Sequence, residues 1–318
     1  MKFFSVGLQP TFQDLGRFGS QSSGINPDGV MDAHTLRLLN ILLQNDENEG
    51  VLEMNFPAPK LLFEENATIC IGGVDFNATL NQQPVPIFKT VNVSTGDVLE
   101  FSKKISGERM YLAVKGGFDL EKWLDSVSYN QAVKLPDLKI EKGLSVELKT
   151  SERVGKEIWL GREMQAPLRL PVTASLKWNL RFLPGPEYDF LTNEAKQKLQ
   201  SSMFQITKDA NRMGYRLEGE ALKTTKDVSL LSSAVTFGTM QLLPGGQLIV
   251  LMASHQTTGG YPNIGTIIST DLPALAQSGP GQLICFKPIP FLEAENLHLA
   301  GQKRMRRLKI SVKLASEY

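Results

Sequence analysis

The fold class of this chain is decided by residues 234–253, AVTFGTMQLLPGGQLIVLMA. They lie within residues 228–270, where no Asp, Glu, Lys or Arg occurs. A membrane-spanning helix needs roughly 20 continuous apolar residues, but turn residues interrupt this stretch at 244–246 and at 256–263. The apolar pieces between the turns have the length of strands and are bounded by Gly and Pro. The stretch therefore predicts a sheet and argues against a membrane span.

Similar strand-like pieces recur along the rest of the chain. Those in the first half are KLLF, ATICIGG, FNATL, VNVSTGDVLEF, MYLAVKGG and LSVELK (60–63, 67–73, 76–80, 91–101, 110–117 and 144–149). Those in the second half, besides 234–253, are WNLRFLPG, IGTIIST and QLICFKPI (178–185, 264–270 and 282–289). Short strands separated by turn residues predict a mainly β protein with a few helices, built as a sandwich or barrel.

Three segments have helical patterns instead. Residues 31–45 place leucines and an isoleucine on one broad face, with Asp32 as a possible N-cap and Asn45 near the end. Residues 187–202 follow a Pro-Gly-Pro turn and predict a second helix. A short third helix is expected over 271–277, where Asp271 would cap and Pro273 would lie in the first turn.

Length and composition indicate an ordinary globular protein of two parts. The chain has 318 residues, 42% of them hydrophobic and 21% charged, and a formal net charge of +1. No bulk attraction to nucleic acid or anionic lipid follows from that charge. Charge and proline are enriched between about 150 and 175, so we expect a β-rich subdomain over 1–155 and another over 156–318.

The N-terminus and the cysteines suggest a cytoplasmic protein. The start, MKFFSVGLQPTFQDLG, has no apolar run of signal-peptide length. Cys70 and Cys285 lie in apolar strand-like runs, as buried free cysteines commonly do. We expect no metal site, because the three histidines are far apart and no CxxC, HxH or HExxH spacing occurs.

The chain lacks the common nucleotide and hydrolase motifs. It has no GxxxxGK[ST] or GxGxxG loop and no GxSxG elbow. If it takes part in ATP-driven chemistry, another chain is expected to supply part of the site. The basic tail 301–318 alternates Leu308, Ile310, Val312 and Leu314 with polar residues, which predicts a half-buried edge strand with outward lysines rather than a nucleic-acid surface.

Candidate site residues gather in a polar, uncharged loop, SHQTTGGYPNIG (254–265). Its side chains can donate and accept hydrogen bonds, and its paired glycines leave backbone N–H groups uncovered. Such a loop suits a neutral amide, urea-like or lactam group, although a well-bonded turn is the alternative. The candidate binding residues here are Gln256, Thr257, Thr258, Gly259, Gly260 and Tyr261.

Further candidates lie outside this loop. In the segment 211–217, Asn211 and Arg212 are candidate binding residues, because an arginine fork fits a carboxylate or phosphate at two points. A surface salt bridge is the alternative for that arginine. Asp14, three residues before Arg17, and Asp32 are candidate carboxylates. Their alternatives are a surface ion pair and a helix cap.

Several of these motifs together resemble one family. TFQDLGRFGS, DGVMDAHTLRLLNILLQN, LAVKGGFD, LPGPEYDFLT, NRMGYRLEG and LMASHQTTGGYPNIGTIISTDLPALAQSGPG occur in this order between about residues 7 and 287. They are similar to the biotin-dependent carboxyltransferase family, also called allophanate hydrolase subunit 2-like, and most closely to its branch of bacterial 5-oxoprolinase C-subunits.

The resemblance implies a fold, partners and a reaction. The fold is largely β with cyclophilin-like barrel features. The partners are proteins like the B-subunit and the A-subunit of 5-oxoprolinase, which together complete an ATP-dependent enzyme that opens 5-oxo-L-proline to L-glutamate. In larger relatives the module transfers a carboxyl group from biotin to urea, and another relative antagonises a histidine kinase. The resemblance therefore leaves two alternatives for this chain, carboxyl transfer to urea or a related amide and regulatory binding of a histidine kinase. The chain has no Met-Lys-Met biotin attachment site, so biotin enters only under the carboxyltransfer alternative.

The chain departs from the family pattern in two places. Ser254-His255 stands where the family usually reads Asp-Arg, and residues 125–128 replace a Gly-Ser-Arg-Ser-type segment. Under the lactam hypothesis Arg212 would hold the carboxylate, and Gln256, Thr257 and a glycine N–H would polarise the ring carbonyl. Asp14 or Asp32 is the expected base, with His255 as a second possibility.

Overall fold

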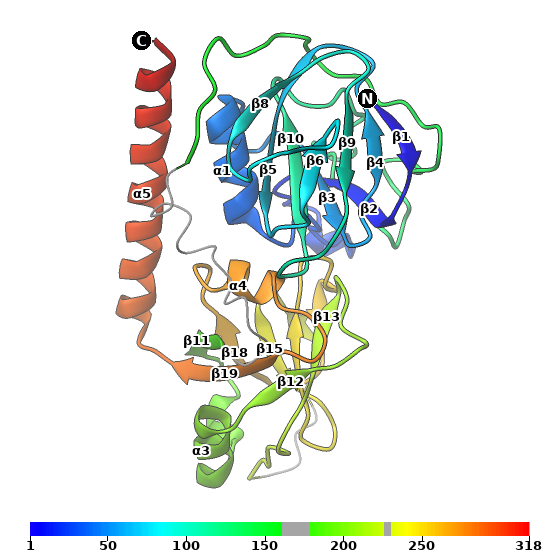
Figure 1. Ribbon diagram of the computed structural model, residues 1–318. Coiled ribbons are helices and arrows are strands. Elements are labelled where there is room, and N and C mark those ends of the chain that lie inside the picture. Colours follow the sequence, from blue (N-terminus) through cyan, green and yellow to red (C-terminus); the bar gives the residue numbers. More distant parts are fainter. Residues whose placement is uncertain (161–177, 226–229, 318) are drawn as a thin grey trace. The chain divides into compact units, whose positions relative to one another are not determined.

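The computed structural model describes residues 1–160, 178–225 and 230–317 (Figure 1). The chain divides into two compact units. The first unit comprises Met1–Arg17, Asp32–Val172 and Lys303–Tyr318, and the second comprises Phe18–Met31 and Thr173–Gln302. The sequence-based division at 155/156 remains a prediction, because most of the segment expected to separate the subdomains, 161–177, lies outside the described residues.

The first unit contains two five-stranded antiparallel sheets. One sheet has the order β1 (Lys2–Ser5), β4 (Lys60–Leu62), β9 (Val98–Phe101), β6 (Ala78–Leu80), β7 (Gln83–Pro84). The other has the order β2 (Leu8–Gln13), β3 (Val51–Asn55), β10 (Met110–Val114), β5 (Ala67–Gly73), β8 (Thr90–Val93). Buried side chains of both sheets, including Phe3, Leu61, Leu112 and Ile69, form one core.

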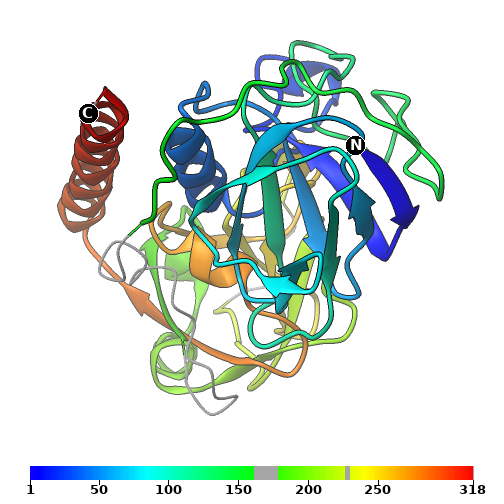
Figure 2. The ribbon, with the colours of Figure 1, turned by 45° about the horizontal axis from the view of Figure 1, so that its top comes forward.

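The interior strand β5 is buried at all seven positions, which explains its unbroken apolar sequence. One side of its sheet faces the shared core, and the helix α1 (Ala33–Leu43) covers the other (Figures 1 and 2). The helix lies close to the strand, since a Cβ atom on Gly72 would lie 2.9 Å from Leu39. A strand buried on both faces reads as a continuous hydrophobic run rather than an alternating one.

The second unit is built on a closed barrel of seven strands. Their order is β11 (Trp178–Pro184), β18 (Asn263–Ile267), β15 (Thr239–Leu242), β16 (Leu248–Leu251), β13 (Gly214–Glu218), β12 (Phe204–Ile206), β19 (Leu283–Pro288). Neighbours are antiparallel except at the closure, where β19 pairs with β11 in parallel. The fold is thus mainly β with a few helices, as predicted.

The uncharged stretch supplies the barrel with three strands and part of its core. Strands β15, β16 and β18 come from it, and Met240, Val250 and Ile264 are fully buried inside. Absence of charge there follows from burial, since an unpaired charge in an apolar core is costly. Among the helices of the described ranges, none combines the length and the apolar character needed to cross a membrane.

The predicted helices form, with two differences in detail. Asp32 caps α1 as predicted, because its carboxylate accepts the Thr35 N–H at 2.9 Å. Residues 187–202 form a 3-10 turn, η3 (Tyr188–Phe190), and then the helix α3 (Asn193–Ser201), which Thr192 caps. The two pieces are separate because the Thr192 side chain starts a new helix.

The predicted capping role of Asp271 is wrong. The short helix α4 (Leu272–Ala276) forms with Pro273 in its first turn, but the Asp271 side chain makes no capping bond. Its carboxylate instead accepts hydrogen bonds from the Arg181 guanidinium at 2.5 and 3.0 Å and from the Arg181 backbone N–H at 2.8 Å. The charged partner on β11 takes the acceptor atoms that a cap would use.

The predicted strand in the C-terminal tail is also wrong, because the segment belongs to α5 (Phe291–Glu317). Leu308 and Val312 fit both a two-residue and a helical period. The other buried position, Met305, fits the helical one, whereas Ile310 and Leu314 are 62% and 52% exposed. Burial at 305, 308 and 312 is the i, i+3, i+7 pattern of a helix.

The segment LSVELK forms no regular strand. It makes only single bridges, between Lys2 and Ser145 and between Phe118 and Leu148. Val146 and Leu148 are nevertheless buried in the core of the first unit. The alternating pattern therefore marks burial correctly, but the backbone of this segment pairs too briefly to make a strand.

Candidate functional site

The candidate residues lie in both units. Asp14 and Asp32 belong to the first unit. Asn211, Arg212, His255 and the loop 256–261 belong to the second. Each group has its own hydrogen-bond surroundings.

The Asp14 carboxylate follows β2 and is enclosed by donors from one segment, 126–128. It accepts the hydroxyls of Ser126 and Ser128 at 2.7 and 2.6 Å and the Val127 N–H at 2.9 Å. The Gly16 N–H donates to the same carboxylate at 2.8 Å. Because the residue is only 2% exposed, these bonds compensate its burial and fix the position of the segment.

Arg17 contributes to the same segment. Its guanidinium donates to the backbone carbonyls of Trp123 and Ser128 and lies 4.7 Å from the centre of the Trp123 ring. The side chain is buried. Asp14 and Arg17 therefore both hold residues 123–128, the region where the chain departs from the family pattern.

Asp32 lies at the N-terminus of α1 and is fully buried. Its carboxylate accepts the Thr35 N–H and the Thr35 hydroxyl, the latter at 2.7 Å. Its own N–H donates to the hydroxyl of Tyr111 at 3.1 Å. Burial and the neighbouring carboxylate of Glu53 raise the pKa of Tyr111 well above its usual value, so the hydroxyl stays protonated.

Arg212 lies two residues before β13 and donates to a backbone oxygen and a hydroxyl oxygen. Its Nε donates to the Ser254 hydroxyl at 3.2 Å, and its guanidinium also donates to the Gly29 carbonyl. The Ser254 N–H in turn donates to the Arg212 carbonyl at 2.8 Å. The Asn26 side-chain amide donates to the Ser254 carbonyl at 3.2 Å. The segment 26–29 is thus joined to both candidate regions of the second unit.

His255 is buried beside this cluster and has a defined tautomer. Its Nδ1 lies 2.6 Å from the Gln256 carbonyl oxygen. Because a carbonyl only accepts, Nδ1 carries the proton and Nε2 is the acceptor of the neutral ring. Burial lowers the pKa of His255, against the opposing effects of the Gln256 carbonyl and the Asp28 charge. The ring is therefore neutral at neutral pH.

Asn211 forms a turn instead of facing a cavity. Its side-chain carbonyl accepts the Met213 N–H at 2.8 Å, and its side-chain amide donates to the Asp209 carbonyl at 3.1 Å. The side chain is exposed. This turn holds the backbone on either side of Arg212, just before β13 begins.

The loop after His255 is a short strand pair with exposed side chains. β17 (Thr258–Gly259) pairs with β14 (Ser233–Ala234), and the Thr257 carbonyl accepts the Val235 N–H at 3.1 Å. Thr257 and Gly259 are partly buried. A Cβ atom on Gly259 would overlap the side-chain amide of Gln241, so any larger residue there would require that side chain to move. The exposed members of the loop are Gln256, Thr258, Gly260 and Tyr261.

Some residues of these clusters were not predicted from the sequence. Asn26 and Asp28 contact or face the Arg212–His255 region, and their amide and carboxylate are 3.4 Å apart. The sequence feature that could have drawn attention to Asn26 and Asp28 is the turn sequence Asn-Pro-Asp-Gly at 26–29. In the structure Asp28 and Gly29 both have positive φ. In the first unit Ser126 and Ser128 were noted only as departures from a family pattern, and no local sequence signal links them to Asp14.

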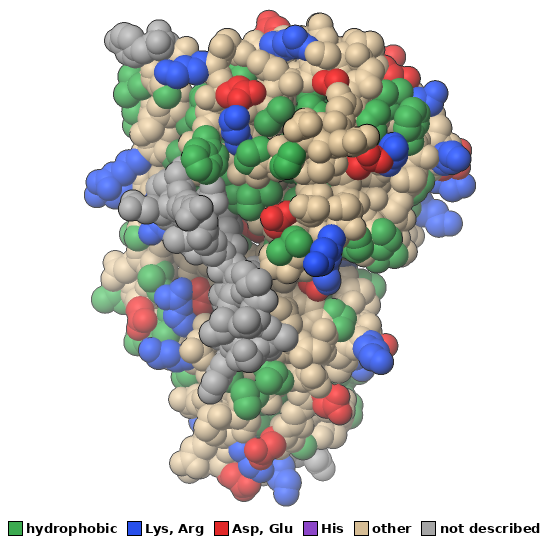
Figure 3. All heavy atoms as spheres, in the orientation of Figure 1, with side chains coloured by type: hydrophobic (Ala, Val, Ile, Leu, Met, Phe, Trp, Pro, Cys, Tyr) green, Lys and Arg blue, Asp and Glu red, His purple; other side chains and the backbone are tan. Residues whose placement is uncertain are grey.

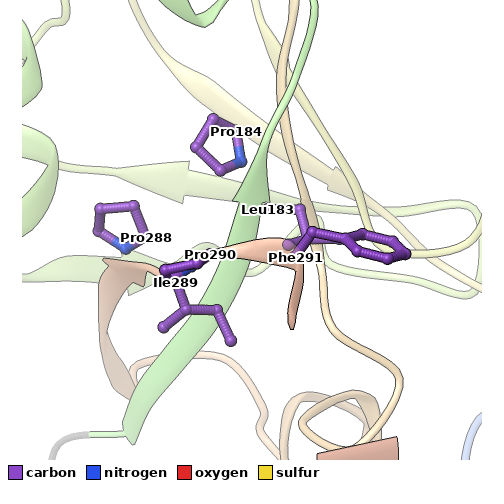
Figure 4. Close-up of a pocket in the computed structure, with 6 residues that line it drawn as sticks. All are labelled: Leu183, Pro184, Pro288, Ile289, Pro290 and Phe291. Atoms are coloured by element: carbon purple, nitrogen blue, oxygen red, sulfur yellow. The ribbon is translucent and has the colours of Figure 1, made fainter. Parts of the chain in front are cut away.

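A separate apolar pocket lies at the end of the barrel (Figure 4). It has a volume of about 530 Å³ and is lined by Leu183, Pro184, Pro288, Ile289, Pro290 and Phe291. Figure 4 shows the lining side chains coming from the ends of β11 and β19 and from the start of α5. None of the candidate site residues lines it, and these six lining residues offer no charged or hydrogen-bonding side chain to a polar substrate.

Fold and family agree on the class of protein. The chain belongs to the carboxyltransferase domain family, subdomains A and B, whose sequence model matches residues 23–288. The chain is 33% identical over 295 residues to the 5-oxoprolinase C-subunit of Haemophilus influenzae, covering 92% of each sequence. It is 35% identical over 296 residues to the 5-oxoprolinase C-subunit of Escherichia coli, covering 92% of this chain and 93% of that protein.

A solved structure has the same fold within a larger chain. The urea amidolyase of K. lactis matches 96% of this chain with a TM-score of 0.86 at 23% sequence identity. The chain spans only 20% of that protein. At this identity the likeness is one of fold.

Proposed function

We propose that this chain is the lactam-binding subunit of an ATP-dependent 5-oxoprolinase. In the reaction, water adds across the ring amide of 5-oxo-L-proline, the C–N bond breaks, and L-glutamate is released. The observation that carries the proposal is the 33% and 35% identity to two 5-oxoprolinase C-subunits, over nearly the whole length of each.

The polar groups of the second unit suit such a substrate. 5-Oxoproline presents a carboxylate and, on its ring, an N–H beside a carbonyl. The guanidinium of Arg212 is the proposed partner of the carboxylate, because arginine binds carboxylates through charge-assisted hydrogen bonds. The exposed amide of Gln256 has a donor and an acceptor to match the two edges of the lactam. Thr257, Thr258 and Tyr261 complete the polar lining.

A backbone N–H is proposed to polarise the ring carbonyl as an oxyanion-type donor. Of the two glycines, Gly260 lies beyond β17 and is exposed, so we assign the donor to Gly260. Gly259 belongs to the strand pair and has a structural role. Asn211 is assigned to positioning, since its side chain forms the turn before Arg212.

Proton transfer is assigned to His255. Its ring is held neutral by burial, and its Nδ1–H is taken by the Gln256 carbonyl, so Nε2 can accept a proton. The carboxylate of Asp14 already accepts hydrogen bonds from residues 127 and 128, and that of Asp32 accepts them from Thr35. We therefore assign both aspartates to positioning: Asp14 for residues 126–128 and Asp32 for α1.

ATP and the rest of the catalyst are assigned to partner chains, namely proteins like the A-subunit and the B-subunit of 5-oxoprolinase. This assignment rests on the absence of a phosphate-loop motif from the sequence and on the fact that both relatives are named as subunits. The test is ATP-dependent glutamate release from 5-oxoproline by this chain alone, by the two partners alone, and by all three. Activity only in the complete mixture supports the proposal. Three folded, associated proteins without activity contradict it.

Carboxyl transfer is the second candidate function, favoured by the description of the family and by the fold shared with urea amidolyase. Here a carboxylated biotin on another protein would donate its carboxyl group to urea or a related amide. This alternative predicts biotin-dependent carboxylation of urea when a biotin carboxylase and its carrier are added. The same mixture would then show no glutamate release from 5-oxoproline.

A further inference from the structure

The C-terminal helix α5 has two opposite apolar faces. Its inner face is formed by Ala294, Met305, Leu308 and Val312, all less than 10% exposed. Four other apolar residues, which we call the outer stripe, are between 52% and 65% exposed: Leu292, Leu299, Ile310 and Leu314. They follow one another at intervals of about two, three and one turns of helix, so they lie along one side. A helix that needs only one face for its own fold leaves the stripe unexplained.

The outer stripe is interrupted by positive charge. Lys303 and Arg306 follow Leu299 by about one and two turns and therefore lie within the stripe, between Leu299 and Ile310. Six cations and no carboxylate occur over residues 303–313, and blue side chains lie along this helix in Figure 3. One of the cations, Lys309, pairs with Glu47 at 2.9 Å. Lys303 and Arg306 are both exposed.

The helix lies beyond the residues that the family's sequence model matches. The family's sequence model ends at residue 288, and α5 begins at Phe291. Phe291 is 69% exposed and lines the apolar pocket at the end of the barrel. The helix therefore adds an exposed apolar surface outside the matched residues.

The pattern of charge decides which occupant fits. In a second copy packed antiparallel, matching Leu299 to Ile310 would place Lys303 opposite Arg306, and like charges would repel. On a bilayer, the same two cations would divide the apolar face into two pairs of residues, which weakens insertion. A protein surface can place apolar groups against both pairs and carboxylates against the cations between them. Helix-in-groove recognition uses such spaced anchors.

We propose that the outer stripe of α5 is the docking surface for a partner protein of the 5-oxoprolinase complex. The partner's contact surface is an apolar groove with carboxylates opposite Lys303 and Arg306. This inference rests on the proposed function only for the identity of the partner. It adds where that partner binds and which charges it carries.

The experiment measures the affinity of the purified full-length chain for the B-subunit-like and A-subunit-like proteins from the same source. Leu299→Gln and Ile310→Gln alter the apolar part of the stripe, and the double variant Lys303→Glu/Arg306→Glu reverses its charge. Leu231→Gln and Lys122→Glu are matched controls, since both residues are exposed and lie outside α5. Circular dichroism and the melting temperature check that each variant is folded.

We expect each apolar variant to weaken binding about tenfold, the effect of a central contact residue worth about 1.4 kcal/mol. The charge reversal should weaken it at least as much, and raised salt should weaken binding of the wild type. The controls should bind as the wild type does. Glutamate release should fall with binding and recover at saturating partner concentration.

Other outcomes overturn the inference, and they differ from failure of the proposed function. If the complex is active and none of the α5 variants changes its affinity, the proposed docking surface is wrong and the proposed function is supported. If the complex depends on the stripe but releases no glutamate, the docking surface is supported and the proposed function is wrong. No complex at all removes both. Stripe-dependent dimerisation of the chain alone, or stripe-dependent flotation with phosphatidylcholine–phosphatidylserine vesicles, assigns the stripe to another occupant.

Discussion

Arg212 donates a hydrogen bond from its Nε to the hydroxyl of Ser254, at 3.2 Å. The sequence resemblance places an aspartate where Ser254 stands, so at this position a hydroxyl accepts from the arginine Nε in place of a carboxylate. This pair therefore links the local departure in sequence to the proposed substrate clamp.

Replacing Ser254 should affect substrate binding more than folding. In Ser254→Ala the Nε of Arg212 loses an acceptor, and we expect the KM for 5-oxoproline to rise about tenfold, as loss of a hydrogen bond to a charged group costs about 1.5 kcal/mol. The measurement is steady-state glutamate release by the reconstituted complex. Ser201→Ala, an exposed serine on α3, is the control. Equal KM values for both variants would rule out the role of Ser254.

Asp14 is expected to be a structural carboxylate whose loss destabilises the protein. In Asp14→Asn, an amide NH₂ replaces an oxygen that now accepts hydrogen bonds, which brings donor against donor in a buried place. The free energy of unfolding should fall by about 3 kcal/mol. Urea unfolding followed by fluorescence measures it. The neighbouring exposed Asp125→Asn should lie within about 0.5 kcal/mol of wild type.

Asp32 can be tested as a helix cap with two substitutions. Asp32→Ala removes the acceptor for the Thr35 N–H and should cost about 1–2 kcal/mol of stability. Asn is about as good a cap as Asp, so Asp32→Asn should recover most of that loss. Thermal unfolding of the two variants measures these changes in stability. If both variants keep wild-type stability, the capping bond contributes nothing.

The stability of the protein should fall in mild acid because of two histidines. Burial lowers the pKa of His255 and of His34 from the usual value of 6.5. Below that value the unfolded chain binds protons that the folded chain does not, so stability is complete above it and decreases as the pH falls. The slope is at most about 1.4 kcal/mol per pH unit for each histidine.

The corresponding measurement is the free energy of unfolding between pH 8 and about pH 5, the range in which histidine titrates. His255→Gln should make the dependence shallower. His298 is exposed and bonded to Ser269 and Gln302, so His298→Gln is the control for the substitution itself. A wild-type stability that is flat over this range would contradict the neutral state assigned to His255.

Much of the fold could be predicted from the sequence, because the local pattern of apolar and polar residues determines whether a segment forms a strand or a helix. The uncharged stretch 228–270 predicted strands, and β15, β16 and β18 form there. The C-terminal tail was mistaken for a strand because Leu308 and Val312 satisfy two periods at once. What distinguishes them is burial of Met305, and burial depends on which surface the segment meets. Asp271 similarly lost its capping role to Arg181, a partner 90 residues away.

The residue types of the candidate site could be predicted from the sequence, but the contacts between those residues could not. Arg212 and His255 were candidates because of their residue types and motifs. Their link to segment 26–29 depends on a fold that returns a distant turn to β13, and no local period encodes such a return. The same holds for Asp14 and Ser128, which are joined at 2.6 Å across 114 residues.

The most direct test of the central claim is the KM for 5-oxoproline of the reconstituted complex that contains Gln256→Ala. Gln256 is exposed in the loop, so its loss should leave the fold intact. Gln83→Ala, another exposed glutamine, is the control. We expect a KM raised about tenfold for Gln256→Ala alone, corresponding to the loss of about 1.4 kcal/mol of binding free energy. A wild-type KM for Gln256→Ala would show that the lactam is bound elsewhere.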